Sequence, residues 1–197
     1  ATLIHYCATF AVTFLMSLYL QHVKLLSPSH TGFILVMAPV LQALFSPFAG
    51  WLSDHREPRI IASTGMACSA VGLAGLAFIG PATRISLILI WLAMLGVGFA
   101  LFSSPNVNAV MGSVETKLYG IASATLATMR LVGQMFSMGI AMLIFSCVIG
   151  DQPLGHANSD LLVLSSRIIL RIMAVTCVAG VFASLARGRV HSGSSTS

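Results

Sequence analysis

The stretch from Gly120 to Ile149, GIASATLATMRLVGQMFSMGIAMLIFSCVI, is thirty residues long and carries a single charge, Arg130. A run of this length with so little charge is typical of a helix that crosses a membrane. At about 1.5 Å per residue, Arg130 lies about 15 Å from Gly120, near the middle of a hydrocarbon core about 30 Å thick. A charge at that depth makes this stretch the most informative part of the chain.

One face of this expected helix collects small and polar side chains. At about 100° per residue, the face contains Ser123, Ala127, Arg130, Gln134, Ser137 and Ala141. An arginine at mid-membrane costs at least about 2.5–3.5 kcal/mol on insertion scales, so Arg130 is expected to face protein or a water-filled cavity. Either the face lines a solute pathway, or Arg130 bonds carbonyl groups of neighbouring helices and holds the bundle together. The sequence leaves both interpretations open.

The composition of the whole chain indicates an integral membrane protein. The 197 residues are 57% hydrophobic and 8% charged, and their mean hydropathy is +0.95. A soluble domain carries about 25% charged residues. The formal net charge of +5 is spread over loops and the C-terminal tail. This charge suits an anionic membrane surface and does not indicate a nucleic-acid partner.

Six apolar segments follow one another along the chain, each long enough to span a bilayer as a helix. Their approximate ranges are 3–20, 31–52, 60–79, 85–104, 120–149 and 161–185. Because the short alternating strands of a membrane barrel are missing, the expected fold is all-α, a polytopic bundle of six transmembrane helices. We expect residues 1–186 to form this bundle and the Gly/Ser-rich residues 187–197 to form a disordered cytoplasmic tail.

The distribution of basic residues predicts the orientation in the membrane. An even number of spans places both termini on one side. The loops and the tail on that side carry five basic residues: Arg56, Arg59, Lys117, Arg187 and Arg189. The loops on the other side carry two, Lys24 and Arg84. The positive-inside rule then places the termini in the cytoplasm, with the plasma (inner) membrane as the expected location. Arg167 and Arg171 begin the last segment on the outer side, where they snorkel to the surface or pair with Asp160.

Two further segments contain polar side chains beside prolines. Gln42 lies between Pro39 and Pro47, which predicts a curved helix because proline removes a backbone hydrogen bond. Gln42 then either faces a cavity or bonds a freed carbonyl. Pro105 is expected to end or kink the fourth segment, and Asn106 after it either caps the break or contacts the solute.

The third segment carries small residues on one helical face. These residues are Gly65, Ser69, Gly72 and Gly75. Small residues at this spacing let membrane helices approach closely, so the face is expected to pack against another helix rather than bind a ligand.

The chain does not contain the side chains that catalysis or metal binding would need. All five carboxylates lie in loops or at segment ends, and none lies inside a span. A proton-carrying acid and a carboxylate pair for acid–base catalysis are therefore both absent. The four cysteines stand alone and the six histidines have no metal-ligand spacing. We expect no enzyme activity, no metal site and no cofactor.

The loop from Gly50 to Arg59, GWLSDHREPR, contains the most specific short motif. It resembles the Gly-x-Leu-x-Asp-Arg-x-Gly-Arg-Arg motif of the major facilitator superfamily. Gly50, Leu52, Asp54 and Arg59 match it, while Glu57 and Pro58 depart from it. An aspartate here can accept hydrogen bonds from the N-terminus of a facing helix, as a cytoplasmic gate would. The alternative is a solvated turn with a local Asp54–Arg59 pair.

A longer resemblance covers nearly the whole chain. The region 101–140, with its Ser104-Pro105-Asn106 and Thr128-Met129-Arg130 triplets, is similar to the last helices of the fourteen-helix drug:proton antiporters. This resemblance implies the C-terminal six-helix half of such a transporter. The N-terminal half, with its proton-titrating acid, would lie outside this chain.

The function implied is half of a secondary active transporter. It would export drugs or amphipathic small molecules in exchange for protons, by rocking of two halves around a central cavity. The implied cavity residues are Arg130, Gln134, Gln42, Asn106 and Ser123, and the implied gate residues are Gly50, Asp54 and Arg59. Partners would be the solute, protons, the lipid bilayer, and the N-terminal half or a second half-transporter chain. The alternative is a truncated fragment that transports nothing, or a half that needs a partner chain.

Overall fold

The computed structural model describes residues 1–150 and 159–185, and the expected tail at 187–197 lies outside them. The described elements are α1 (Thr2–Thr9), α2 (Ala11–Leu18), the π-helix η1 (Tyr19–Val23), α3 (Pro28–Leu35), α4 (Met37–His55), α5 (Pro58–Leu76), α6 (Ile85–Met111), the 3-10 helix η2 (Thr116–Leu118), α7 (Tyr119–Ile149) and α8 (Ser159–Leu185).

Within the described residues, these elements form six helices that are long and apolar enough to cross a membrane. They are Thr2–Val23, Pro28–His55, Pro58–Leu76, Ile85–Met111, Thr116–Ile149 and Asp160–Leu185. The prediction of an all-helical bundle with six spans is therefore confirmed. The first two spans are each divided, at Phe10 and at Val36.

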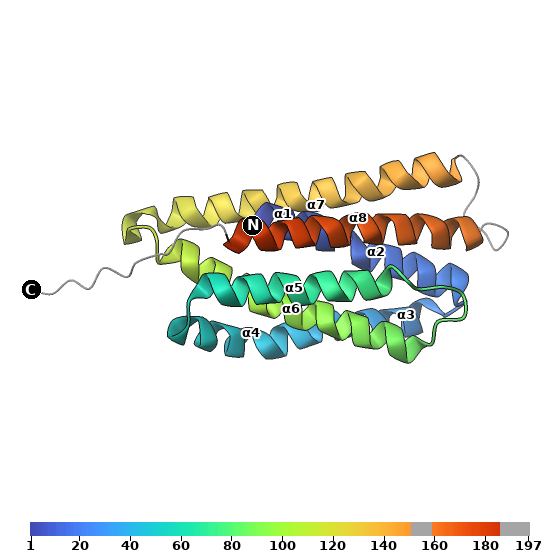
Figure 1. Ribbon diagram of the computed structural model, residues 1–197, viewed down its shortest axis with the longest axis horizontal. Helices are drawn as coiled ribbons and strands as arrows, with labels where there is room; N and C mark the ends of the chain where they lie inside the picture. Colours follow the sequence, from blue (N-terminus) through green and yellow to red (C-terminus); the bar gives the residue numbers. More distant parts are fainter. Residues whose placement is uncertain (151–158, 186–197) are drawn as a thin grey trace, which may run out of the picture.

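The helices lie side by side along the long axis of the molecule, as Figure 1 shows. Helix α5 packs against both α6 and α8, α4 packs against α6, and α1 packs against α7 and α8. Helices α4 and α7 lie at opposite edges of the view in Figure 1. Both edge helices leave large apolar side chains exposed, including Leu44 and Phe48 on α4 and Met135 and Leu143 on α7.

The small residues of α5 form a close packing face against α6. A Cβ atom added to Gly65 would lie 2.6 Å from the backbone nitrogen of Phe102, and one added to Gly72 would lie 3.1 Å from the carbonyl oxygen of Trp91. Ser69 is fully buried where α5 meets Gly98 of α6. The expected helix-packing role of this face is confirmed, because any larger side chain would push the two backbones apart.

The sequence predicts that Pro105 either ends or kinks α6, and the structure shows that the helix does not end there. It continues for six more residues, to Met111, with the buried Pro105 inside it. The proline removes only one N–H donor from the helix. A membrane interior offers the remaining backbone groups no partner other than the helix itself. Continuing the helix therefore costs less than ending it there.

Candidate functional site

Arg130 of α7 lies over the ring of Tyr6 of α1. The guanidinium carbon is 5.1 Å from the ring centroid. The arginine side chain is exposed, while Tyr6 is buried. A cation over an aromatic ring gains about 0.5–1 kcal/mol at an exposed site and about 2 kcal/mol where water is excluded. Tyr6 therefore holds the positive charge in one place at mid-span while leaving it accessible.

Tyr6 belongs to an aromatic cluster shared by α1 and α6. Its ring packs edge-on against Phe99 at a centroid distance of 5.7 Å. His5 lies 4.7 Å from Phe99 and 4.0 Å from Phe102, measured between ring centroids. His5 is fully buried, and within the described residues neither of its ring nitrogens has a hydrogen-bond partner. The cluster therefore packs against Tyr6, whose ring carries the contact with Arg130.

Two contacts hold α7 against α1 beside this cluster. Gly133 allows a close backbone approach, because a Cβ atom there would lie 2.6 Å from the carbonyl oxygen of Leu3. The hydroxyl of Ser137 accepts a hydrogen bond from the backbone N–H of Ala11 at 3.0 Å. The bond gives a partner to the amide of Ala11, which directly follows Phe10, where the first span is divided. Gly133 and Ser137 thus fix the position of Arg130 over Tyr6.

The polar face expected on α7 is divided in the structure. Ser137 and Ala141 are buried, and Ser137 bonds α1 rather than facing a pathway. Ser123 and Arg130 are exposed, and Gln134 is half-buried. The part of the face around Ser137 and Ala141 is therefore a packing surface, while the part around Ser123 and Arg130 is exposed.

The two other cavity candidates lie on different helices. Gln42 of α4 is half-buried, and its side-chain amide makes no hydrogen bond within the described residues. Asn106 of α6 is buried, and its side-chain amide donates to the hydroxyl of Thr2 at 2.9 Å. Asn106 therefore links α6 to α1 in this structure. Contact of Gln42, Asn106, Gln134 or Ser123 with a solute stays a prediction.

The motif between α4 and α5 sits beside the last turns of α6. A Cβ atom on Gly50 would lie 3.0 Å from the hydroxyl of Ser104, so this glycine permits close packing of α4 on α6. Asn108 donates to Ser53 at 2.8 Å and more weakly to a carboxylate oxygen of Asp54 at 3.5 Å. Asp54 is exposed, and its carboxylate remains available to a further donor.

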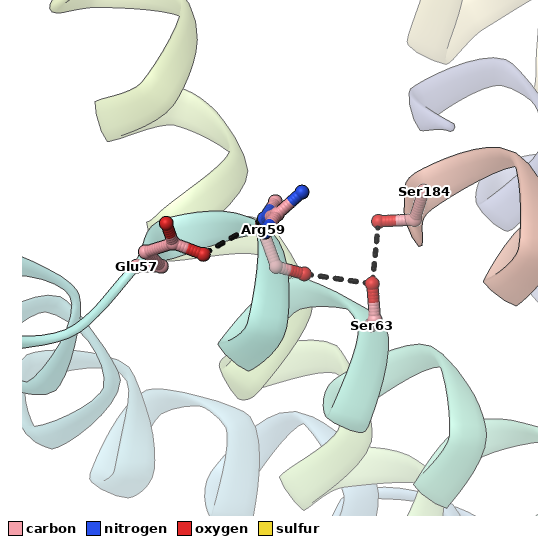
Figure 2. A network of polar contacts seen from close by, with 4 residues as sticks. All are labelled: Glu57, Arg59, Ser63 and Ser184. Carbon is pink, nitrogen blue, oxygen red and sulfur yellow. Dashed lines mark hydrogen bonds and ion pairs between the residues drawn. The ribbon is translucent and has the colours of Figure 1, made fainter. Parts of the chain in front are cut away.

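Arg59 fixes the start of α5 through several contacts. Its guanidinium pairs with the carboxylate of Glu57 at 2.8 Å. Its backbone carbonyl accepts from Ser63 at 2.7 Å, and the hydroxyls of Ser63 and Ser184 are hydrogen-bonded at 2.9 Å. Figure 2 shows how these contacts connect the loop to the end of α8. Arg59 therefore acts locally as an anchor of α5, and a gating role for it stays a prediction.

Neither Tyr6, which contacts Arg130, nor the aromatic side chains packed against Tyr6 could be identified from the sequence. Tyr6 and Phe99 lie in apolar segments where an aromatic side chain is unremarkable. His5 gave a weak signal, since it is the one histidine within an apolar segment. A contact between residues more than 120 positions apart cannot be found from helical spacing alone.

Comparison with known proteins places this geometry in context. The model of the Major Facilitator Superfamily matches residues 1–195. The chain is 31% identical to the riboflavin transporter RibZ of Clostridioides difficile, over 69% of this chain and 29% of RibZ. It is 30% identical to the uncharacterized transporter YebQ of Escherichia coli, over 93% of this chain and 38% of YebQ.

A more distant relative is named for drug resistance. The chain is 29% identical to the lincomycin resistance protein LmrB of Listeria monocytogenes, over 67% of this chain and 28% of LmrB. In each of these alignments the chain spans less than two fifths of the relative's length.

Proposed function

This chain belongs to the major facilitator superfamily, and from that membership we propose that it forms half of a transporter that exports drugs or amphipathic small molecules in exchange for protons. The family is one of membrane transporters rather than enzymes, in agreement with the absence of catalytic motifs. Two relatives of the chain support the proposal by their names: one is a riboflavin transporter, and the other is a lincomycin resistance protein.

The observation that carries the proposal is the exposed guanidinium of Arg130, held over Tyr6 at mid-span. A charge at this depth is costly unless it faces protein or water. The Tyr6 ring below it belongs to the α1–α6 aromatic cluster, and Gln134 follows Arg130 one helical turn later on α7. An amphipathic solute would find an aromatic ring and one cation here.

The proposed mechanism is alternating access between two six-helix halves. Arg130, Gln134, Gln42, Asn106 and Ser123 would polarise the wall of the central cavity on this side. The exposed carboxylate of Asp54 would accept hydrogen bonds from the N-terminus of a helix in the other half, and so hold the cytoplasmic side closed. Protons would be carried by an acid outside this chain, because its five carboxylates lie at the ends of spans or in loops, and none lies in the interior of a span.

The test of the site uses the natural full-length polypeptide in inverted vesicles with an imposed proton gradient. We expect Arg130→Ala to abolish uptake of an amphipathic fluorescent dye while the thermal midpoint of the protein is preserved, and Arg130→Lys to retain part of the uptake. Arg171→Ala, on the exposed surface of α8, is the matched control. Normal uptake by a folded Arg130→Ala protein would contradict the proposed role of Arg130.

A separate experiment tests the gate. Asp54→Asn removes the negative charge but keeps the shape of the side chain. Cysteine accessibility on the two sides of the membrane is then expected to shift toward the state that is open to the cytoplasm. An unchanged balance of the two states would rule out the lock.

A further inference from the structure

Two cations from different parts of the chain bind the turn between α5 and α6. The ammonium of Lys24, just after η1, donates to the carbonyl oxygen of Pro81 at 2.7 Å. The guanidinium of Arg167, on α8, donates through Nε to the carbonyl oxygen of Ile79, also at 2.7 Å. The two accepting residues are two positions apart, so their Cα atoms are separated by at most about 7.6 Å. Two segments far apart in the sequence thus bring two positive charges to one short turn.

The position of the Arg167 guanidinium depends on the glycine between these two carbonyls. A Cβ atom added to Gly80 would lie 2.8 Å from Nη2 of Arg167. The carbonyl oxygen of Gly80 itself accepts from the hydroxyl of Tyr19 at 2.7 Å. Three successive carbonyls are therefore each bound by a side chain from another element, which makes the site rigid.

The charge of both cations is uncompensated in the described part of the chain. Their only described partners are neutral carbonyl oxygens. A lysine has three N–H donors and an arginine five, so most of these donors remain available. The acid in the first turn of α8, Asp160, is seven residues before Arg167, about 10 Å along the helix axis. The free donors of both side chains can therefore bind a negatively charged group that has several acceptor oxygens.

The side chains around these two cations suit a bound phospholipid. The turn lies at the end of the bundle opposite the Asp54 loop (Figure 1), and a bilayer crossed by these spans would place that end at the level of the headgroups. Phe78, directly before the turn, is 76% exposed. Leu164, one helical turn before Arg167 and hence its neighbour on α8, is also exposed. Cations at headgroup level with exposed apolar side chains beside them match an anionic phospholipid better than a soluble anion.

We propose that Lys24 and Arg167 bind the phosphate of an anionic phospholipid in the leaflet opposite the Asp54 loop. The remaining N–H donors of both side chains contact the phosphate oxygens, and the acyl chains lie along Phe78 and Leu164. Bound lipid then tightens the junction of η1, α8 and the α5–α6 turn.

The test measures phospholipid binding to the purified full-length protein by native mass spectrometry. Phosphatidylglycerol and phosphatidylcholine with identical acyl chains are the probes. We expect the protein to bind phosphatidylglycerol more tightly than phosphatidylcholine. Either Lys24→Gln or Arg167→Gln should weaken the binding of phosphatidylglycerol about fivefold, because one basic residue near the surface contributes on the order of 1 kcal/mol to binding anionic lipid. Arg171→Gln, four residues further along α8 and exposed, is the control that should not weaken it.

Additional variants keep the proposal testable if the glutamine variants fail to fold. Lys24→Arg preserves the charge and should retain binding, while Phe78→Ser should weaken the binding of long-chain lipid. Equal binding of the two lipids, or undiminished binding by folded Lys24→Gln and Arg167→Gln proteins, would overturn the site. Glycerol 3-phosphate that competes as strongly as phosphatidylglycerol would identify a soluble anion as the ligand and overturn the lipid assignment.

Discussion

At the scale of single residues, Gly133 controls the distance between α7 and α1. A Cβ atom there would lie 2.6 Å from the carbonyl oxygen of Leu3 and 3.0 Å from Cβ of Tyr6. We expect Gly133→Ala to destabilise the protein by about 1–3 kcal/mol, as overpacking does, and to shift Arg130 away from the Tyr6 ring. The thermal midpoint in detergent measures the effect.

Gly139 provides the matched control for this prediction. It lies six residues further along α7, and a Cβ atom added to it would meet nothing within 4 Å. Gly139→Ala should therefore leave stability unchanged or raise it slightly, since alanine favours a helix more than glycine does. Equal midpoints for the two variants would contradict the role given to Gly133.

At the scale of elements, α7 supplies a hydrogen-bond partner to the first span directly after Phe10, where that span is divided. The backbone N–H of Ala11 is bonded by the hydroxyl of Ser137, and both residues are buried. Ser137→Ala leaves that donor without its partner, at an expected cost of about 1–3 kcal/mol. Hydrogen exchange at the Ala11 amide should accelerate accordingly. The control is Ser146→Ala, at an exposed site on the same helix, which should not change this exchange rate. An unchanged exchange rate in Ser137→Ala would show that α1 and α2 do not need this bond.

At the scale of the whole molecule, the two ends of the bundle are chemically distinct. One end carries the Asp54 loop and the turn after α6, and the other carries the α5–α6 turn with its two cations. The positive-inside rule predicts that the Asp54 end is cytoplasmic. In a cysteine-free full-length protein, Ser113→Cys should react with a membrane-impermeant maleimide only from the cytoplasmic side, and Ala82→Cys only from the opposite side. The reverse pattern would invert the predicted topology.

Much of the fold could be predicted from sequence because its signals are local. Each span is a continuous apolar run, and a bilayer forces such a run to become a helix. The small residues from Gly65 to Gly75 repeat at helical spacing, so their packing role could be predicted from one segment alone. The depth of Arg130 follows from counting residues along α7.

Only the tertiary structure decided which partners these residues have. Ser137 and Arg130 share a face of α7 in the sequence, yet Ser137 is buried against α1 and Arg130 is exposed over Tyr6. The two cations of the α5–α6 turn come from positions more than 140 residues apart. Such contacts depend on the crossing angle and relative rotation of neighbouring helices. These are set by side-chain packing across the whole bundle, which the periodicity of a single helix does not encode.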